Sequence, residues 1–323
     1  MAQGRPRVLV TGGSSGIGFE LARQFAEDGH DVTLAAQDVD KLEHSAELIR
    51  ERAPDVAVDT IAADLASDAG VFQLHRTLKD AGTIDIFCAN AGIGSGGGDF
   101  TETDLDQELR LIDLNVRGLV QLSKLVVRDM AARGEGRILY TASIAGIMPG
   151  PFEAVYAASK AFVRSFGEAL RNELADKGIH VTVFMPGPTE TDFFTRAHME
   201  NTPAGQAAKD DAAEVAAQAI EALRDDRHAA LTGSLKTRVQ GQAAKWLSDP
   251  ARAAVHRKQT EPLDREPAES GGLGPAAIGG LFFVGALAAA GTAMWLQSRD
   301  EDSRRIRERG EPKADFEVAG TSF

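Results

Sequence analysis

The 323-residue chain has little cysteine and few basic residues. Its one cysteine, Cys88, cannot form an intrachain disulfide, and no group of cysteine and histidine has zinc-ligand spacing. We therefore expect no metal site, and the cysteine content is consistent with a reducing compartment. Only 35 Lys and Arg stand against 48 Asp and Glu, a net charge of −13, which argues against binding nucleic acid by neutralising phosphates.

The N-terminus has no apolar segment of secretory type, and the first apolar run, residues 8–10, has only the length of a strand. The main body is therefore expected in the cytoplasm. Short β-branched runs alternate with longer helical patterns, as in βαβ units around a parallel sheet that is buried on both faces. We predict strands at residues 7–11, 31–36, 56–62, 84–89, 137–141, 179–185 and 229–232. We predict helices at residues 16–28, 41–52, 69–81, 105–132, 154–175 and 212–224.

Beyond residue 250 this alternation stops. Residues 259–275 are rich in Pro, Gly and Glu without periodicity, which predicts a flexible linker. Residues 278–296 are uncharged and long enough for a transmembrane helix, which needs about 20 residues; a buried soluble helix or an oligomer contact is the alternative. We thus predict one domain over 1–250, a helix end and linker over 251–275, a membrane helix over 276–298 and a charged tail over 299–323.

The first strand runs into a glycine-rich turn that opens the first helix. At such a turn, backbone N–H groups and the helix dipole can hold a pyrophosphate, because the missing side chains let the backbone approach the ligand. Glycines alone often serve only tight turns, but the position between a strand and a helix favours dinucleotide binding. The turn reads Thr11-Gly12-Gly13-Ser14-Ser15-Gly16-Ile17-Gly18.

Tyr156 and Lys160 lie four residues apart, on one face of a predicted helix. A neighbouring cation favours the phenolate and lowers a tyrosine pKa, which would let Tyr156 exchange a proton with a carbonyl or alcohol oxygen near neutral pH. An isolated Y-x-x-x-K pattern more often means a half-buried ring beside a solvated lysine. The Tyr156–Lys160 pattern is evidence for this chemistry only in combination with other motifs of the chain.

Further polar and glycine residues follow the later strands: Asn90-Ala91-Gly92 after the fourth, Ser143 after the fifth and Pro186-Gly187 after the sixth, with Asn115 in the long helix. In order and spacing, residues 7–233 closely resemble the short-chain dehydrogenase/reductase family. The resemblance implies a single doubly wound, Rossmann-type α/β domain. It also implies an enzyme that transfers a hydride between a nicotinamide and a carbonyl or alcohol carbon.

The resemblance implies four catalytic roles. Tyr156 is the general acid/base, and Lys160 lowers its pKa and bonds the nicotinamide ribose. Ser143 orients the substrate oxygen, and Asn115 holds a water in the proton relay. Taken singly, each residue has an alternative role: a turn for Ser143, a helix kink for Asn115, and a bond within its own loop for Asp64, a further candidate. The implied cofactor contacts are Thr11, Gly12, Ser14, Ser15, Gly16, Ile17, Gly18, Gln37, Asp64, Leu65, Asn90, Ala91, Gly92, Tyr156, Lys160, Pro186, Gly187 and Thr189.

The end of the second strand bears on the choice of cofactor. An acid there would receive the ribose 2′-hydroxyl of NAD, whereas a nearby Arg accommodates the 2′-phosphate of NADP. Ala36 occupies the acid position, and Gln37 stands where NADP-preferring relatives often have Arg. Asp38 and Asp40 are expected to cap the next helix. The missing acid favours NADP over NAD.

The substrate is expected to be a small carbonyl or alcohol compound, and several residues near its site hint that it is lipophilic. The alternative is that they are ordinary packing residues under mobile loops. They are Ile144, Ile147, Met148, Phe152, Phe193 and Phe194.

The resemblance further suggests a homo-oligomer that assembles through the helices at 105–132 and 154–175. With the apolar segment at 276–298, we expect a cytoplasmic catalytic domain anchored at the membrane. Positive-inside counting conflicts with this topology, because the tail carries six Lys and Arg and residues 255–272 carry three. The alternative function is a catalytically idle dinucleotide-binding sensor or scaffold at the membrane.

Overall fold

The computed structural model describes residues 5–244 and 246–265. Seven parallel strands form one sheet in the order β3-β2-β1-β4-β5-β6-β7. This confirms the predicted Rossmann-type sheet and all seven predicted strands, with ends that differ by at most two residues. The strands are β1 (Arg7–Thr11), β2 (Asp31–Ala36), β3 (Val58–Ala62), β4 (Ile86–Ala89), β5 (Gly136–Thr141), β6 (Ile179–Pro186) and β7 (Ala229–Thr232).

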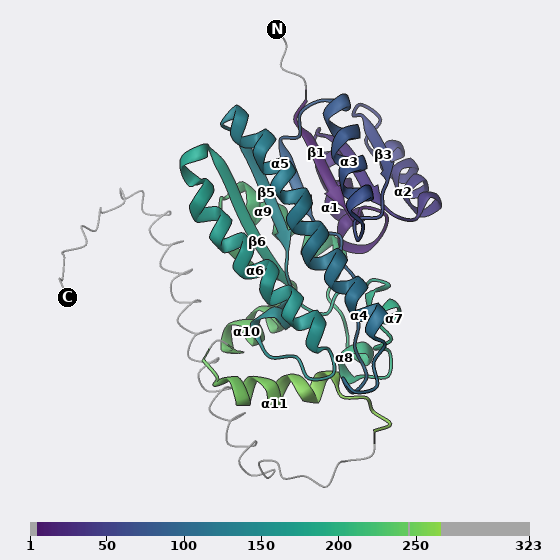
Figure 1. The fold of residues 1–323 in the computed structure, drawn as a ribbon, viewed down its shortest axis with the longest axis vertical. Coiled ribbons are helices and arrows are strands. Elements are labelled where there is room, and N and C mark those ends of the chain that lie inside the picture. Colours follow the sequence, from purple (N-terminus) through teal and green to yellow (C-terminus); the bar gives the residue numbers. More distant parts are fainter. Residues whose placement is uncertain (1–4, 245, 266–323) are drawn as a thin grey trace, which may run out of the picture. The chain divides into compact units, whose positions relative to one another are not determined.

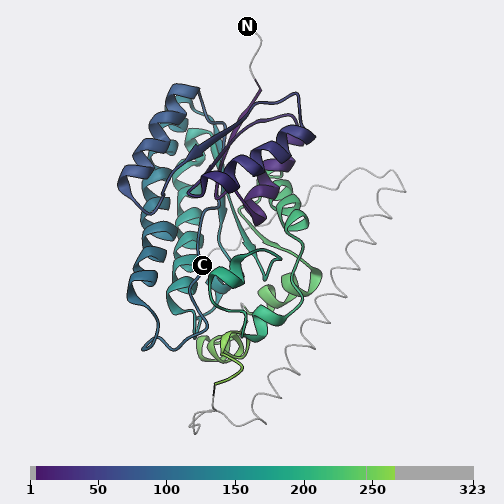
Figure 2. The ribbon, with the colours of Figure 1, turned by 90° about the vertical axis from the view of Figure 1, so that its right-hand side faces the viewer.

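Helices cover both faces of the sheet, as Figures 1 and 2 show. On one face, α1 (Gly16–Glu27), α2 (Val39–Arg52) and α9 (Ala212–Arg224) share one apolar core with the strands. On the other face, α3 (Asp68–Ala81), α5 (Leu119–Arg133) and α6 (Ala154–Leu174) share a second core. A parallel sheet covered on both faces explains why its strands read as continuous apolar runs.

The predicted long helix at 105–132 is not one regular helix. It consists of α4 (Leu105–Ile112), a π-helical segment, η1 (Asp113–Gly118), and α5. At Gly118 a Cβ atom would lie 1.8 Å from the carbonyl oxygen of Leu65, so only glycine lets the helix pass this close to the chain after β3. The π-helical segment also carries Asn115.

Several short helices gather near the carboxyl ends of the strands (Figure 1). They are η2 (Ile144–Ile147), α7 (Phe193–Arg196), α8 (Pro203–Gln206), α10 (Leu235–Ala244) and α11 (Asp249–Thr260), while η3 (Ala175–Lys177) follows α6. Apart from a helix end within residues 251–275, the predictions did not include them. Regular structure therefore continues past residue 250, and α11 includes residues 259 and 260 of the expected linker.

The reason that α11 escapes the sequence pattern is visible in its burial. The two buried residues of α11 are His256 and Thr260, one helical turn apart. An amphipathic helix is normally found by the spacing of its apolar residues, and here the buried positions are polar.

The described residues include no helix that is long and apolar enough to cross a membrane. The predicted membrane helix at 276–298 and the charged tail at 299–323 lie outside the described residues, as does most of the expected linker.

Candidate active site

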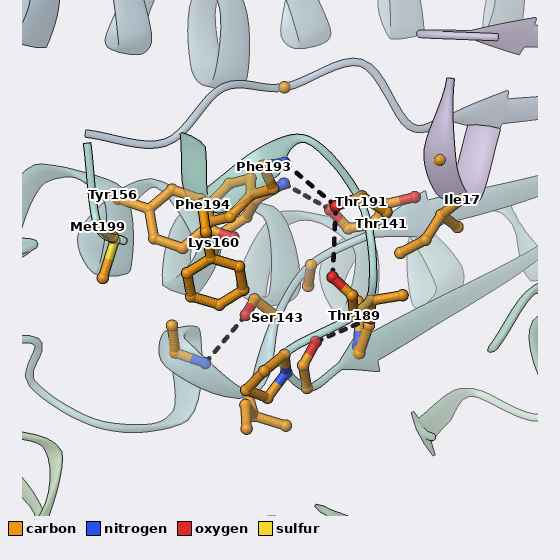
Figure 3. Close-up of a pocket in the computed structure, with 18 of the residues that line it drawn as sticks. Ile17, Thr141, Ser143, Tyr156, Lys160, Thr189, Thr191, Phe193, Phe194 and Met199 are labelled. Carbon is orange, nitrogen blue, oxygen red and sulfur yellow. Dashed lines mark hydrogen bonds between the residues drawn. The ribbon is translucent and has the colours of Figure 1, made fainter. Parts of the chain in front are cut away.

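A pocket opens where the carboxyl ends of β1, β4, β5 and β6 meet. Figure 3 shows Tyr156 beside Phe193, Phe194 and Met199, with Ile17 on the opposite side. Most of the residues expected to bind cofactor or substrate line this one pocket. These are Gly12, Ser14, Ser15, Gly16, Ile17, Gly18, Asn90, Ala91, Gly92, Ser143, Tyr156, Lys160, Pro186, Gly187 and Thr189.

The glycine-rich turn presents an uncapped helix end to the pocket. The side chains of Asp38 and Ser67, the N-caps of α2 and α3, each accept a hydrogen bond from the first turn of their helix. Ser15, the N-cap of α1, makes no such bond, and the first turn of α1 contains no acidic residue. The N–H groups of this turn are therefore left for an anionic ligand, as at a pyrophosphate site.

Two glycines that line this end of the pocket are packed too closely by neighbouring side chains to carry a Cβ atom easily. Gly16 has φ +55°, and a Cβ atom on it would lie 2.7 Å from Cγ2 of Thr191. A Cβ atom on Gly92 would lie 3.1 Å from Oδ1 of Asn115 and 3.3 Å from Nζ of Lys160. The residues present thus fit a dinucleotide that lies against bare backbone.

Thr11 is buried and does not line the pocket; it organises residues that do. Its hydroxyl accepts hydrogen bonds from the N–H groups of Asn90, at 3.0 Å, and Ala91, at 3.1 Å. Nδ2 of Asn90 donates to the carbonyl oxygen of Thr11 at 3.1 Å, and Oδ1 of Asn90 accepts from the hydroxyl of Thr141, also at 3.1 Å. These bonds tie the ends of β1, β4 and β5 together.

Ser143, Tyr156 and Lys160 all line the pocket. Oγ of Ser143 accepts a hydrogen bond from the N–H of Ala145 at 3.1 Å, which leaves the hydroxyl hydrogen able to donate. Nζ of Lys160 donates to the carbonyl oxygen of Thr141 at 3.0 Å and lies 5.9 Å from the centre of the Tyr156 ring.

The direction of the Tyr156 pKa differs from the expectation. Burial raises the pKa of Tyr156, the charge of Glu153 raises it further, and the hydrogen bond to Ser143 lowers it. Burial also lowers the pKa of Lys160 to about 8. Desolvation weakens the ammonium that was expected to favour the phenolate, so in the chain alone Tyr156 is held as the neutral phenol.

Asn115 lies behind the pocket wall rather than in it. Its Oδ1 accepts from the N–H of Ile93 at 3.0 Å, and its Nδ2 donates to the carbonyl oxygen of Ile93 at 2.9 Å and to Oγ of Ser159 at 3.1 Å. Asn115 therefore fixes the chain just after Gly92 from within a π-helical segment, a feature that is frequent at functional sites.

Gln37 and Asp64 do not line the pocket; an arginine from a distant helix joins them. The guanidinium of Arg110, in α4, donates to Oε1 of Gln37 at 3.2 Å and to Oδ1 of Asp64 at 3.1 Å. Oδ1 of Asp64 also accepts from the N–H of Ala66 at 3.1 Å, so the carboxylate bonds its own loop as well. Leu65 is buried in the core. The sequence pattern did not single out Arg110, because it lies 73 residues from Gln37.

The substrate side of the pocket matches the sequence only in part. Ile144, Met148, Phe193 and Phe194 line it, whereas Ile147 and Phe152 do not. Many other residues that line the pocket were not predicted, and three of them are polar side chains from α11. The unpredicted residues include Glu153, Met199, Ala204, His256, Gln259 and Thr260.

No spacing in the sequence signals these residues, because they belong to separate elements.

Among the residues that the structure describes, no group of His, Cys, Asp and Glu is arranged to hold a metal ion.

Comparison with known proteins gives three findings that agree with this geometry. The sequence profile of a family described as "short chain dehydrogenase" matches residues 6–202. An uncharacterized oxidoreductase of Mycobacterium tuberculosis is 37% identical over 198 residues, which are 60% of this chain and 77% of that protein. A dehydrogenase/reductase SDR family protein 7-like of Anopheles gambiae is 33% identical over 275 residues, 80% of this chain and 84% of that protein.

A solved structure resembles this fold. It is a short-chain dehydrogenase from Sphingobium yanoikuyae in complex with NADPH, with a TM-score of 0.66 and 31% identity; the match covers 70% of this chain and 87% of that one.

Proposed function

The chain belongs to the short-chain dehydrogenase/reductase family and is an NAD(P)-dependent oxidoreductase, and on that basis we propose that it reduces a carbonyl compound with Tyr156 as the proton donor. The observation that carries the proposal is that Ser143, Tyr156 and Lys160 share one pocket with the uncapped N-terminus of α1. A bound nicotinamide dinucleotide would supply the hydride, and the protein the positioning and the proton.

The proposed proton transfer follows from the pKa directions. A substrate oxygen between Ser143 and Tyr156 gains negative charge as a carbonyl is reduced, so their hydroxyl donors act mainly on the transition state. Because burial and Glu153 raise the pKa of Tyr156, the phenol keeps its proton at neutral pH and is available as an acid. Lys160, with its pKa lowered to about 8, can return a proton near neutral pH.

The turnover screen is the direct test. A panel of lipophilic and small carbonyl compounds is offered with NADPH and with NADH to the wild type and to Tyr156→Phe. We expect turnover by the wild type, a loss of about 10²–10⁴-fold in Tyr156→Phe, and cofactor binding retained by both proteins. Near-normal turnover by Tyr156→Phe would refute the mechanism. Cofactor binding without turnover of any compound would instead support the idle sensor or scaffold.

We propose NADP as the preferred cofactor. The support is that Ala36 leaves no acid at the end of β2 and that Arg110 brings a guanidinium to Gln37. Guanidinium groups suit the recognition of a phosphate. In this arrangement α4 supplies the positive charge that NADP-preferring relatives often carry at the position of Gln37.

Equilibrium binding tests this role without turnover. In Arg110→Gln we expect the affinity for 2′,5′-ADP to fall about tenfold and the affinity for 5′-ADP to stay within about twofold. Arg117→Gln is the matched control, since Arg117 lies on the next turns of the same helical region and pairs with Asp68 and Asp113. An equal loss for both nucleotides would remove the phosphate role.

We also propose a homo-oligomer. The support is a row of exposed apolar side chains on α4, formed by Leu105, Leu109 and Ile112, together with the exposed Phe162 on α6. Side chains at this spacing share one face of a helix. A monomeric mass in light scattering across micromolar concentrations would contradict it.

The cytoplasmic location, the domain ends near residues 250 and 275, and the membrane anchor at 276–298 rest on the sequence alone. If washing membranes with alkaline carbonate releases the full chain, the anchor is wrong. Release of a chain truncated after residue 265, but not of the full chain, would support it.

A further inference from the structure

A buried acid faces the substrate side of the pocket beside Tyr156. Glu153 is the N-cap residue of α6, three positions before Tyr156, and both residues line the pocket. Oε1 of Glu153 lies 2.5 Å from Nε2 of His256, and both side chains are 5% exposed. The two residues are 103 positions apart, and His256 belongs to α11, beyond the region that the family profile matches.

The loop before α6 holds α11 in place. The hydroxyl of Thr260 donates to the carbonyl oxygen of Pro151 at 2.7 Å, and the guanidinium of Arg252 donates to that of Ile147 at 3.2 Å. These bonds fix α11 against the segment that joins Ser143 to Tyr156. His256 therefore meets Glu153 as part of a built contact and not as a chance approach of two surface groups.

The ring nitrogen of His256 that carries the hydrogen can be assigned. Nδ1 of His256 is fully buried and has no hydrogen-bond partner among the described residues. A hydrogen on Nδ1 would be a buried, unpaired donor, which costs more than a bare nitrogen that accepts nothing. Nε2 therefore carries the hydrogen and donates it to Glu153.

The second oxygen of Glu153 has no such partner. No residue in the described ranges donates a hydrogen bond to Oε2. Oε2 is not fully buried either, so part of its surface remains accessible. Glu153 lines the pocket and its Oε1 is taken by His256, so Oε2 is the oxygen left for a ligand there. Tyr156 lines the same pocket three positions further along the chain, and the charge of Glu153 raises its pKa.

Apolar side chains line the pocket together with Glu153, and the polar side chains of Arg196 and Gln259 line it as well. Met148, Phe193, Phe194 and Met199 line the same side of the pocket, and the rings of Tyr156 and Phe193 are 5.1 Å apart. A carboxylate oxygen in such a place is costly unless something donates a hydrogen bond to it. A substrate that fills the pocket and displaces water must supply that donor or leave the oxygen unpaired.

We propose that Oε2 of Glu153, oriented by His256, is a recognition site for a hydroxyl group on the substrate, so that the enzyme prefers hydroxy ketones or hydroxy aldehydes to unsubstituted carbonyl compounds. This inference rests on the proposed carbonyl reduction and narrows its substrate class. His256 is the positioning residue, since it holds one carboxylate oxygen and leaves the other for the substrate.

Matched ketones test the proposal. Butanone, 1-hydroxybutan-2-one, 4-hydroxybutan-2-one and 4-methoxybutan-2-one differ in whether they carry a donor, and the methoxy compound keeps the oxygen without the donor. We expect kcat/KM for at least one hydroxy ketone to exceed those of butanone and of the methoxy ketone about tenfold or more, because a site built for a hydroxyl rejects an analogue that lacks it. Equal values for the hydroxy and methoxy ketones would overturn the proposal.

Glu153→Gln sharpens the test. The amide oxygen of Gln can still accept from His256, and its NH₂ group then turns a donor toward the pocket. The preference for hydroxy ketones over the methoxy ketone should therefore disappear, because a hydroxyl oxygen and a methoxy oxygen can both accept from this NH₂ group. Glu168→Gln is the control: Glu168 also belongs to α6 but bonds Arg164 at 3.2 Å and does not line the pocket, so the ratio should stay as in the wild type.

A binding experiment separates failure of this inference from failure of the proposed function. If no ketone is reduced, calorimetric binding of butane-1,3-diol and butan-2-ol to the protein with NADP⁺ still compares a ligand with and without the second hydroxyl. Tighter binding of the diol, lost in Glu153→Gln, would support the site. Equal binding of both alcohols would refute it. The comparison of the two alcohols in the wild-type protein tests the proposed site even if Glu153→Gln does not fold.

Discussion

The cofactor region and the substrate region of the pocket are built in different ways. The cofactor region uses backbone groups of one short turn, Gly12–Gly18, and the ends of neighbouring strands. The substrate region uses side chains from η2, α6, α7, α8 and α11, which are far apart in the chain. The first kind of site leaves a local motif in the sequence, whereas the second exists only when the elements have packed. A substrate is therefore harder to infer from a sequence than a cofactor.

After Tyr156→Phe, the largest effect is expected where the two regions meet, at Ser143. Ser143→Ala removes a hydroxyl donor from the reacting oxygen, and the loss of one such donor costs about 10²–10³-fold in kcat. The cofactor region is unchanged, so the dissociation constant for NADPH should stay as in the wild type. Steady-state kinetics and fluorescence titration measure the two quantities.

Ser234→Ala is the control for this variant, because Ser234 lies outside the pocket and bonds Thr237. A fall in kcat of less than about threefold would mean that Ser143 serves only its turn, through its bond with the N–H of Ala145.

Lys160→Met tests how burial of the Lys160 ammonium changes the free energy of unfolding. Burial lowers the pKa of Lys160 from 10.5 to about 8, so between these pH values the unfolded chain holds a proton that the folded chain has released. The contribution of Lys160 to the free energy of unfolding therefore rises with pH across this window. Lys160→Met removes that rise, on the order of 3 kcal/mol between pH 7 and 10.5. Urea unfolding at the two pH values measures the difference.

The exposed Lys124 on α5 gives the matched variant, Lys124→Met, which should leave the pH dependence unchanged. If Lys160→Met also leaves it unchanged, the ammonium is not desolvated in the folded protein. Loss of turnover in Lys160→Met alone would not separate these cases, because the same residue serves the proposed proton transfer.

Gly16 tests the cofactor region by itself. Gly16→Ala puts a Cβ atom 2.7 Å from Cγ2 of Thr191 at a backbone φ of +55°, and strain of this kind costs about 1–3 kcal/mol. We expect NADPH affinity to fall about 5- to 100-fold, with kcat at saturating NADPH nearly unchanged. Thr191→Ser in the same chain removes the close methyl group and should restore part of the affinity.

Gly29→Ala is the control that separates the effect of backbone strain from an effect on the cofactor site. Gly29 has φ +85° and no atom within 4 Å of a Cβ on it, so this variant should lower thermal stability without changing NADPH affinity. The same loss of affinity in Gly29→Ala would show that general destabilisation, and not the shape of the turn, weakens binding.

Local features made much of the fold predictable. The apolar strand runs and the helical periodicity located all seven strands and the six main helices, because both faces of this sheet are buried in continuous cores. Asp38 caps α2 as predicted, through a bond from the N–H of Lys41 at 3.1 Å, whereas Asp40 lies inside the first turn of the helix and is not a cap. The π-helical segment that carries Asn115 was not predicted, because it has only 6 residues and lies between two regular helices.

Residue types at short, fixed spacings predicted the parallel sheet, the glycine turn and the shared helix face of Tyr156 and Lys160, and the family resemblance added Ser143. Three features became visible only in the folded chain: Arg110 reaches Gln37, burial raises the pKa of Tyr156, and His256 meets Glu153 across 103 residues. These depend on which elements pack together and on what is removed from water. Neither can be predicted from the spacing of residues that are neighbours in the sequence.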